Sequence, residues 1–170
     1  ALDTHVLERE RGITIFASQA EFTVGDTRVT LLDTPGHVDF SSETERTLGV
    51  LDYAVLVISG LDGVQPHTRT LWKLLKLYNV PTFVFVTKMD FARREKDDII
   101  AELNSELDGD FIDFAAESRD EDIALCDDLL TEKFLNGEKI TDGEITRAVK
   151  GRLFFPCFFG SGLKLDGVED

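Results

Sequence analysis

The chain has 170 residues, of which 42% are hydrophobic and 30% charged, a composition that fits a globular domain with a buried core and excludes a disordered or fibrous chain. The formal net charge is −15, so the chain as a whole lacks the broad basic face that dominates binding to a phosphate backbone, and DNA binding is not expected. No apolar run approaches the roughly 20 residues that span a bilayer and no signal peptide opens the chain, so we expect a cytoplasmic protein without a membrane partner.

Two short β-prone segments, residues 21–24 and 28–32, are separated by a turn that contains Gly25 and Asp26. This pair tolerates the positive φ angles that a tight hairpin requires. The segment therefore predicts a β-hairpin.

Residues 53–59 and 82–87 are continuous runs of β-branched and aromatic side chains. Such runs are typical of strands that are covered on both faces, as in a parallel sheet. Apolar residues at helical spacing lie between them, in residues 71–78. Strand, helix and strand in this order predict a βαβ unit and an α/β fold.

A second amphipathic helix is predicted over residues 94–107, with Ile100, Leu103 and Leu107 on its buried face. Acidic residues are concentrated in the part of the chain that follows. Between residues 91 and 150 there are 8 basic and 18 acidic residues. We therefore expect an acidic insert at about residues 108–150 that docks onto the α/β framework.

The insert is predicted to hold two short helices, at about residues 127–135 and 142–149. A further strand follows at residues 153–158. It contains Pro156, which cannot donate a hydrogen bond to a central ladder, so we expect this strand at an edge of the sheet. Neither cysteine has a second cysteine or a histidine pair at metal-ligand spacing, so neither a disulfide framework nor a zinc site is expected.

The motif Asp33-Thr-Pro-Gly36-His37 follows an apolar strand directly, where open α/β sheets collect ligands. A carboxylate there can hold a hydrated cation, and Gly36 lets its backbone N–H approach a phosphate oxygen. His37 could orient a water molecule. Taken alone, the pattern is also that of a plain turn.

The motif Thr87-Lys88-Met89-Asp90 lies at the end of a later strand of the same predicted sheet. The carboxylate of Asp90 can accept hydrogen bonds from the N1–H and the N2 amine of guanine, which adenine cannot supply. An unmatched partner would cost on the order of 1–3 kcal/mol. Taken alone, Lys-x-Asp is also compatible with a solvated loop.

Two weaker motifs flank these. Arg11-Gly-Ile13-Thr14-Ile15 supplies a hydroxyl and an apolar neighbour before the first motif, and Gly160-Ser161-Gly162 follows the last predicted strand. The second could bring backbone N–H groups to a carbonyl of a ligand. Each is by itself compatible with an ordinary strand start or a tight loop.

Together and in this order, the four motifs resemble the nucleotide-binding motifs of translational GTPases. Residues 7–12 and 63–69 extend the likeness along nearly the whole chain. Residues 127–137 look like the equivalent stretch of tetracycline-resistance ribosomal protection proteins. Within the family, the chain resembles these proteins most, elongation factor G second and release factor 3 third. The resemblance implies a P-loop NTPase-like, Rossmann-like α/β fold, with a mostly parallel sheet and helices on both faces. It also implies GTP or GDP and Mg²⁺ as ligands and the ribosome as partner.

The resemblance also implies roles for the first two motifs. Thr14 and Asp33 would hold Mg²⁺, Thr14 also contacting the γ-phosphate, and Ile13 would form part of an apolar gate over the attacking water. The Gly36 amide would bind the γ-phosphate, and His37 would position the water.

The later motifs would form the guanine site. Lys88 would pack along the purine, Asp90 would select guanine, and Ser161 and Gly162 would contact its oxygen. Thr87 stands where the family usually has Asn, which predicts weaker guanine affinity. Gly162, where Ala is usual, is a milder departure.

The family's phosphate loop, Gly-x-x-x-x-Gly-Lys-Ser/Thr, is absent, since none of the 13 glycines precedes a lysine. We therefore expect a partial G domain, residues 1–170, that lacks the N-terminal strand and binds nucleotide poorly. Loss of a central strand predicts open sheet edges, which would close either by re-pairing or by borrowing a strand from another copy, as a homo-oligomer. Two alternatives stay open, a fragment of an elongation factor G-type translocase and a nucleotide-free interaction module.

Overall fold

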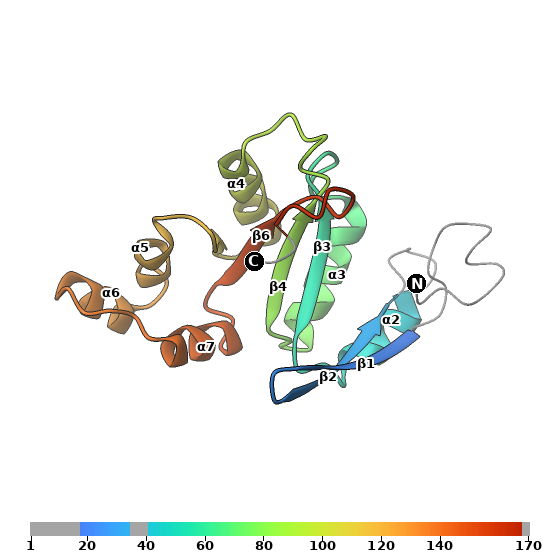
Figure 1. Cartoon of the computed structure of the whole chain (residues 1–170), viewed down its shortest axis with the longest axis horizontal. Helices are drawn as coiled ribbons and strands as arrows, with labels where there is room; N and C mark the ends of the chain where they lie inside the picture. The colour runs from blue at the N-terminus through green and yellow to red at the C-terminus, as the bar shows by residue number, and fades with distance from the viewer. Residues whose placement is uncertain (1–17, 35–40, 168–170) are drawn as a thin grey trace. The chain divides into compact units, whose positions relative to one another are not determined.

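The computed structural model describes residues 18–34 and 41–167, and the chain divides into two compact units, residues 1–51 and 52–170. The described residues of the first unit form an antiparallel pair of strands, which Figure 1 draws in blue, and one helix. Its elements are β1 (Ser18–Val24), β2 (Thr27–Asp33) and α2 (Ser41–Leu48). Gly25, at a φ of 57°, occupies the turn between the strands, so the predicted hairpin is confirmed.

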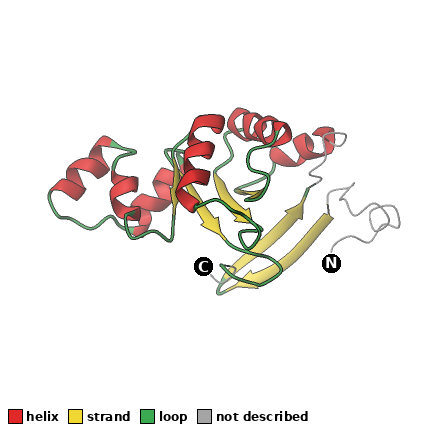
Figure 2. Cartoon of the chain, turned by 90° about the horizontal axis from the view of Figure 1, so that it is seen from above, coloured by secondary structure: helices red, strands yellow, loops and turns green. Residues whose placement is uncertain are grey.

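The second unit is an α/β fold whose helices connect parallel strands, as Figure 2 shows in red and yellow. Its four strands have the order β3-β4-β6-β5. The elements in chain order are β3 (Ala54–Ser59), α3 (Pro66–Leu77), β4 (Thr82–Thr87), α4 (Lys96–Leu107), β5 (Phe111–Asp113), α5 (Arg119–Ala124), α6 (Asp128–Leu135), α7 (Asp142–Lys150) and β6 (Phe155–Phe159). The predicted α/β class is confirmed. No helix in the described residues is long and apolar enough to cross a bilayer.

One face of this sheet is well covered. The ring of Trp72, on α3, lies 5.0 Å from that of Phe111 and 4.6 Å from that of Phe155, measured between centroids. Val84 and Cys157, which are paired in the register and so share that face, are fully buried. Burial of this apolar surface, at roughly 25 cal/mol per Å², is what stabilises the helix on the sheet.

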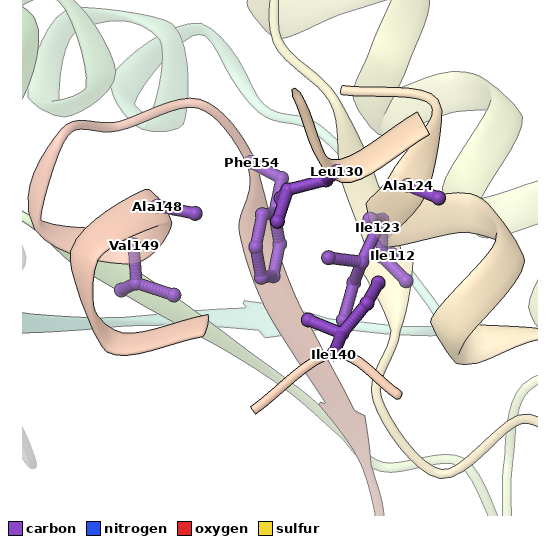
Figure 3. Packing of buried hydrophobic residues seen from close by; sticks show 8 residues of the cluster. All are labelled: Ile112, Ile123, Ala124, Leu130, Ile140, Ala148, Val149 and Phe154. Carbon is purple, nitrogen blue, oxygen red and sulfur yellow. The ribbon is translucent and has the colours of Figure 1, made fainter. Parts of the chain in front are cut away.

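The opposite face is covered unevenly. Val55 and Val57, on β3, are 63% and 62% exposed. At β5 and β6 the insert supplies a core of its own, which Figure 3 shows in close-up. Its buried residues are Ile112, Ile123, Ala124, Leu130, Ile140, Ala148, Val149 and Phe154. The exposed valines leave room for another segment to pack against β3. Pairing between copies of the chain stays a prediction.

The predicted edge position of the strand with Pro156 is wrong. β6 lies between β4 and β5. The Phe155 N–H donates to the Asp110 carbonyl on the β5 side, so the nitrogen of Pro156 faces β4. Pairing with β4 begins only at Cys157. Because the missing donor falls just before that ladder starts, proline is tolerated in an interior strand.

Two local features also differ from the prediction. The short strand β5 and the helix α5 were not predicted, since three and six residues carry too little periodicity to be recognised. On α4 the fully buried residues are Ile99, Leu103 and Leu107, while Ile100 is half-buried. The buried stripe therefore runs at a spacing of four residues.

Helix α7 begins with a capping box. The Thr141 hydroxyl accepts from the Glu144 N–H, and the Glu144 carboxylate accepts from the Thr141 N–H at 2.8 Å. The Lys133 ammonium donates to both carboxylate oxygens of Glu144, at 2.8 Å each. The hydrogen bond from Lys133, followed by those from Thr141, lowers the pKa of Glu144 to about 2. One carboxylate thus ties α6 to the start of α7.

Replacing Glu144 with Gln should lower the stability of the chain at neutral pH and flatten its acid dependence. A carboxyl group whose pKa is lower in the folded than in the unfolded state stabilises the fold above the unfolded pKa. That contribution is lost as the pH falls from about 4.5 toward 2. Melting temperatures between pH 7 and pH 2 should therefore fall more steeply for the unmodified chain than for Glu144→Gln. Glu132→Gln, at an exposed position of α6, is the control and should follow the unmodified chain.

Candidate guanine-nucleotide site

The candidate site lies where β4 and β6 end. The two strands are parallel neighbours, so their carboxyl ends meet at one edge of the sheet, where open α/β folds bind ligands. Backbone hydrogen bonds join the loops that follow them. The Met89 N–H donates to the Gly160 carbonyl at 3.1 Å, and the Gly160 N–H donates to the Val86 carbonyl at 2.9 Å. The two loops are therefore held in a fixed relation.

A hollow of about 310 Å³ lies beside these loops. It is lined by Met89, Asp90, Lys96, Phe159, Gly160, Ser161, Lys164 and Asp166. The side chain of Asp90 is only 6% exposed, and its Oδ2 lies 3.9 Å from the Lys164 Nζ. Its Oδ1 is buried and has no hydrogen-bond partner among the described residues. An unsatisfied buried acceptor costs about 1–3 kcal/mol, so this oxygen marks a place for a donor from a ligand.

The loop at residues 160–167 is tightly folded. The Ser161 N–H donates to the Asp166 carbonyl at 2.9 Å, and the Ser161 hydroxyl accepts from the Lys164 N–H at 3.3 Å. A Cβ at position 160 would lie 2.2 Å from the Asp166 carbonyl oxygen. Gly160 is therefore required by close backbone approach.

Gly162 lies close to Thr87, since a Cβ at position 162 would be 3.9 Å from the Thr87 hydroxyl oxygen. Lys88 is exposed and has a φ of 59°, and its carbonyl accepts from the Phe91 and Ala92 N–H groups. This turn carries the chain around the end of β4. The structure thus brings five of the predicted site residues to one edge of the sheet: Thr87, Lys88, Asp90, Ser161 and Gly162.

The other predicted site residues fall in the first compact unit or outside the described residues. Asp33 is the last residue of β2, in the first compact unit, and is half-buried. Ile13, Thr14, Gly36 and His37 lie outside the described residues. In the part of the chain that is described, no three His, Cys, Asp or Glu side chains gather as a metal site.

A charged contact fixes the neighbouring loop between β3 and α3. The Gly60 N–H donates to the Thr87 carbonyl at 2.8 Å, which ties this loop to the end of β4. The Glu102 carboxylate, on α4, accepts from the Val64 N–H at 2.8 Å and from Arg94 at 2.5 Å. Burial alone raises the pKa of Glu102, but the Val64 N–H and the Arg94 guanidinium outweigh it and hold this pKa below its ordinary value. Glu102 therefore stays charged and holds the loop at the site's edge.

Sequence reasoning missed three charged residues of the hollow. Lys164 and Asp166 follow Ser161 within the same glycine-flanked loop, and that proximity was the available signal. Lys96 carried no such signal, because it reaches the hollow only through the packing of α4. Its ammonium group lies 3.3 Å from an Asp113 carboxylate oxygen and 5.2 Å from the centroid of the Phe159 ring.

Both cysteines are free thiols. Burial, with smaller contributions from nearby carboxylates, raises the pKa of Cys126 to about 11 and that of Cys157 further. A thiol with a raised pKa is a poor nucleophile and metal ligand. Neither thiol is therefore a candidate for catalysis.

Known proteins resemble the chain over nearly its whole length. The profile of the elongation factor Tu GTP binding domain matches residues 1–170. The chain is 37% identical to an oxytetracycline resistance protein of Streptomyces rimosus and 38% identical to the tetracycline resistance protein TetM of Streptomyces lividans. These alignments cover 98% and 96% of this chain and 29% of each relative.

A solved structure of a protein from Thermus thermophilus has the same fold. It superposes with a TM-score of 0.81 over 99% of this chain and 32% of that one, at 24% identity. The chain thus spans less than a third of the length of each of these proteins. The profile match over all 170 residues, on a fold and a loop arrangement of the expected kind, shows that the chain belongs to the elongation factor Tu GTP binding domain family.

Proposed function

We propose that the chain is part of the GTP-binding and GTP-hydrolysing domain of a ribosome-associated translational GTPase, of the class that confers tetracycline resistance. The names of the relatives support the resistance assignment. The proposal covers the whole of residues 1–170 as part of one G domain, with an acidic insert at about residues 108–150. It assigns the longer protein to the cytoplasm, with the ribosome as its partner.

The buried carboxylate of Asp90 is the observation that carries the proposal. Guanine presents two adjacent donors, N1–H and the N2 amine, and a carboxylate matches both. Adenine has an acceptor at N1 and no amine at position 2, so it would leave the carboxylate unmatched. The unpartnered Oδ1 of Asp90 is the acceptor that guanine would satisfy.

The neighbouring residues complete the proposed base site. The Gly162 backbone is exposed beside Thr87, so its N–H can donate to the guanine carbonyl oxygen. The exposed stem of Lys88 can pack along the purine ring. Ser161 is buried and supports the loop through its hydroxyl.

The phosphate end of the site is assigned to the earlier motifs. The Gly36 N–H would bind the γ-phosphate, and His37 would position the attacking water under a gate that includes Ile13. Asp33 and Thr14 offer the oxygen ligands that Mg²⁺ prefers alongside phosphate groups. When bound, Mg²⁺ would neutralise charge that develops on the phosphate oxygens, and the residues named here would do the positioning that phosphoryl transfer requires.

Calorimetry with GDP and Mg²⁺ tests the proposal. The 170-residue chain should bind weakly, and a longer form that carries a phosphate-binding loop upstream should bind tightly, since that loop supplies backbone N–H groups and a lysine. If neither form binds GDP, the nucleotide-free interaction module is favoured instead. Expression of the longer protein in a sensitive bacterium should raise the tetracycline concentration that stops growth, whereas an elongation factor G-type translocase would leave it unchanged.

A further inference from the structure

The hollow contains a cation beside the carboxylate that is assigned to guanine. The Lys164 Nζ lies 3.9 Å from the Oδ2 of Asp90. The two side chains differ in exposure, 58% for Lys164 and 6% for Asp90. The carboxylate is therefore buried, while the ammonium group reaches it from the solvent side.

The backbone of Lys164 is well placed for this contact. Its N–H donates to the Ser161 hydroxyl, and the Ser161 N–H donates to the Asp166 carbonyl, so the loop holds the start of the side chain at the rim of the hollow. Lys96, the other cation that lines the hollow, is engaged by Asp113 and by the Phe159 ring. Lys164 is therefore the cation that pairs with Asp90.

Base and lysine compete for one group. A guanine base must bring two N–H donors to the Asp90 carboxylate, and the Lys164 ammonium group lies 3.9 Å from Oδ2, one of the two oxygens that these donors would use. We propose that Lys164 neutralises Asp90 in the nucleotide-free protein and is displaced when guanine binds, so that it sets the affinity of the base site. This inference rests on the proposed function of Asp90 as the guanine-selecting residue.

The size of the effect follows from the exposure of the pair. When only a fraction of the protein is in the state that can bind, the apparent affinity for the ligand is reduced by that fraction. Ion pairs with an exposed partner are worth roughly 0.2–1 kcal/mol, and 1 kcal/mol is about a fivefold change in affinity. Removing the ammonium group should therefore tighten binding of the base by up to about fivefold.

Guanosine is the suitable probe, because it carries no phosphate whose attraction to a lysine would mask the effect. Titration of the 170-residue chain, followed by ¹H–¹⁵N NMR at the loops after β4 and β6, should give a dissociation constant about 1.4- to fivefold lower for Lys164→Gln than for the unmodified chain. Lys164→Arg keeps the cation and should bind no more tightly than the unmodified chain. Lys76→Gln is the matched control, since Lys76 is similarly exposed and pairs with Asp108 at the other end of α3.

Each outcome is decisive. Guanosine binding that is unchanged or weaker in Lys164→Gln would overturn the competition, while leaving Asp90 as the guanine-selecting residue. Binding of guanosine and adenosine alike, or of neither, in all the variants would contradict the proposed function and with it this inference. High salt should shrink the difference between Lys164→Gln and the unmodified chain, because an exposed ion pair is screened.

Discussion

Asp90→Asn should lower the affinity for guanine nucleotides by about 10- to 150-fold and shift the preference to xanthine nucleotides. The carboxylate offers two acceptors, whereas the amide offers one acceptor and one donor, so one guanine donor would meet another donor. A hydrogen bond to a charged group is worth about 1.5–3 kcal/mol, which corresponds to that range of affinity. Xanthine carries a carbonyl in place of the 2-amine, and the amide of Asn matches it.

The measurement is competition between GDP and XDP in the longer form that carries a phosphate-binding loop. Asp62→Asn is the control, because it makes the same change of charge at an exposed position of the loop between β3 and α3. It should bind GDP as the unmodified protein does. Retention of full GDP affinity by Asp90→Asn would show that the carboxylate does not read the base.

Phe154→Ala should destabilise the chain by about 3–5 kcal/mol, the range that is typical of truncating a fully buried aromatic ring. Phe154 has no exposed surface and lies in the core that the insert forms with the sheet, directly before β6 (Figure 3). Its loss would leave a cavity against Ile112 of β5 and Ile123 of α5. An ordinary domain has a total free energy of unfolding of about 5–15 kcal/mol. The expected loss is a large part of that total, so the variant should be severely destabilised.

Urea unfolding, followed by circular dichroism, measures this change. Leu135→Ala is the matched control, since this α6 side chain is 78% exposed and should change the stability by no more than about 0.5 kcal/mol. Equal effects of the two substitutions would mean that the insert does not share a cooperative core with the sheet.

The sequence predicted most of the elements, because their patterns are local. Two uninterrupted β-branched runs became β3 and β4, and Gly25 with Asp26 became the hairpin turn. The place of β6 could not be predicted in the same way. Whether Pro156 is tolerated depends on the register with β4, which is a property of the paired strands and not of either one.

The order of short motifs along the chain was enough to propose residues for a base site and to name the guanine nucleotide as the ligand to test. Each of those motifs lies at the end of a strand, and the ends of strands can be predicted from runs of hydrophobic residues. Only the tertiary structure showed that Asp90 is buried with an unpartnered oxygen and that Lys164 stands beside it. The burial of Asp90 and its pairing with Lys164 depend on contacts between segments about 70 residues apart in the sequence. The local pattern of side chains reports the periodicity of each element, and it does not report which distant segments meet.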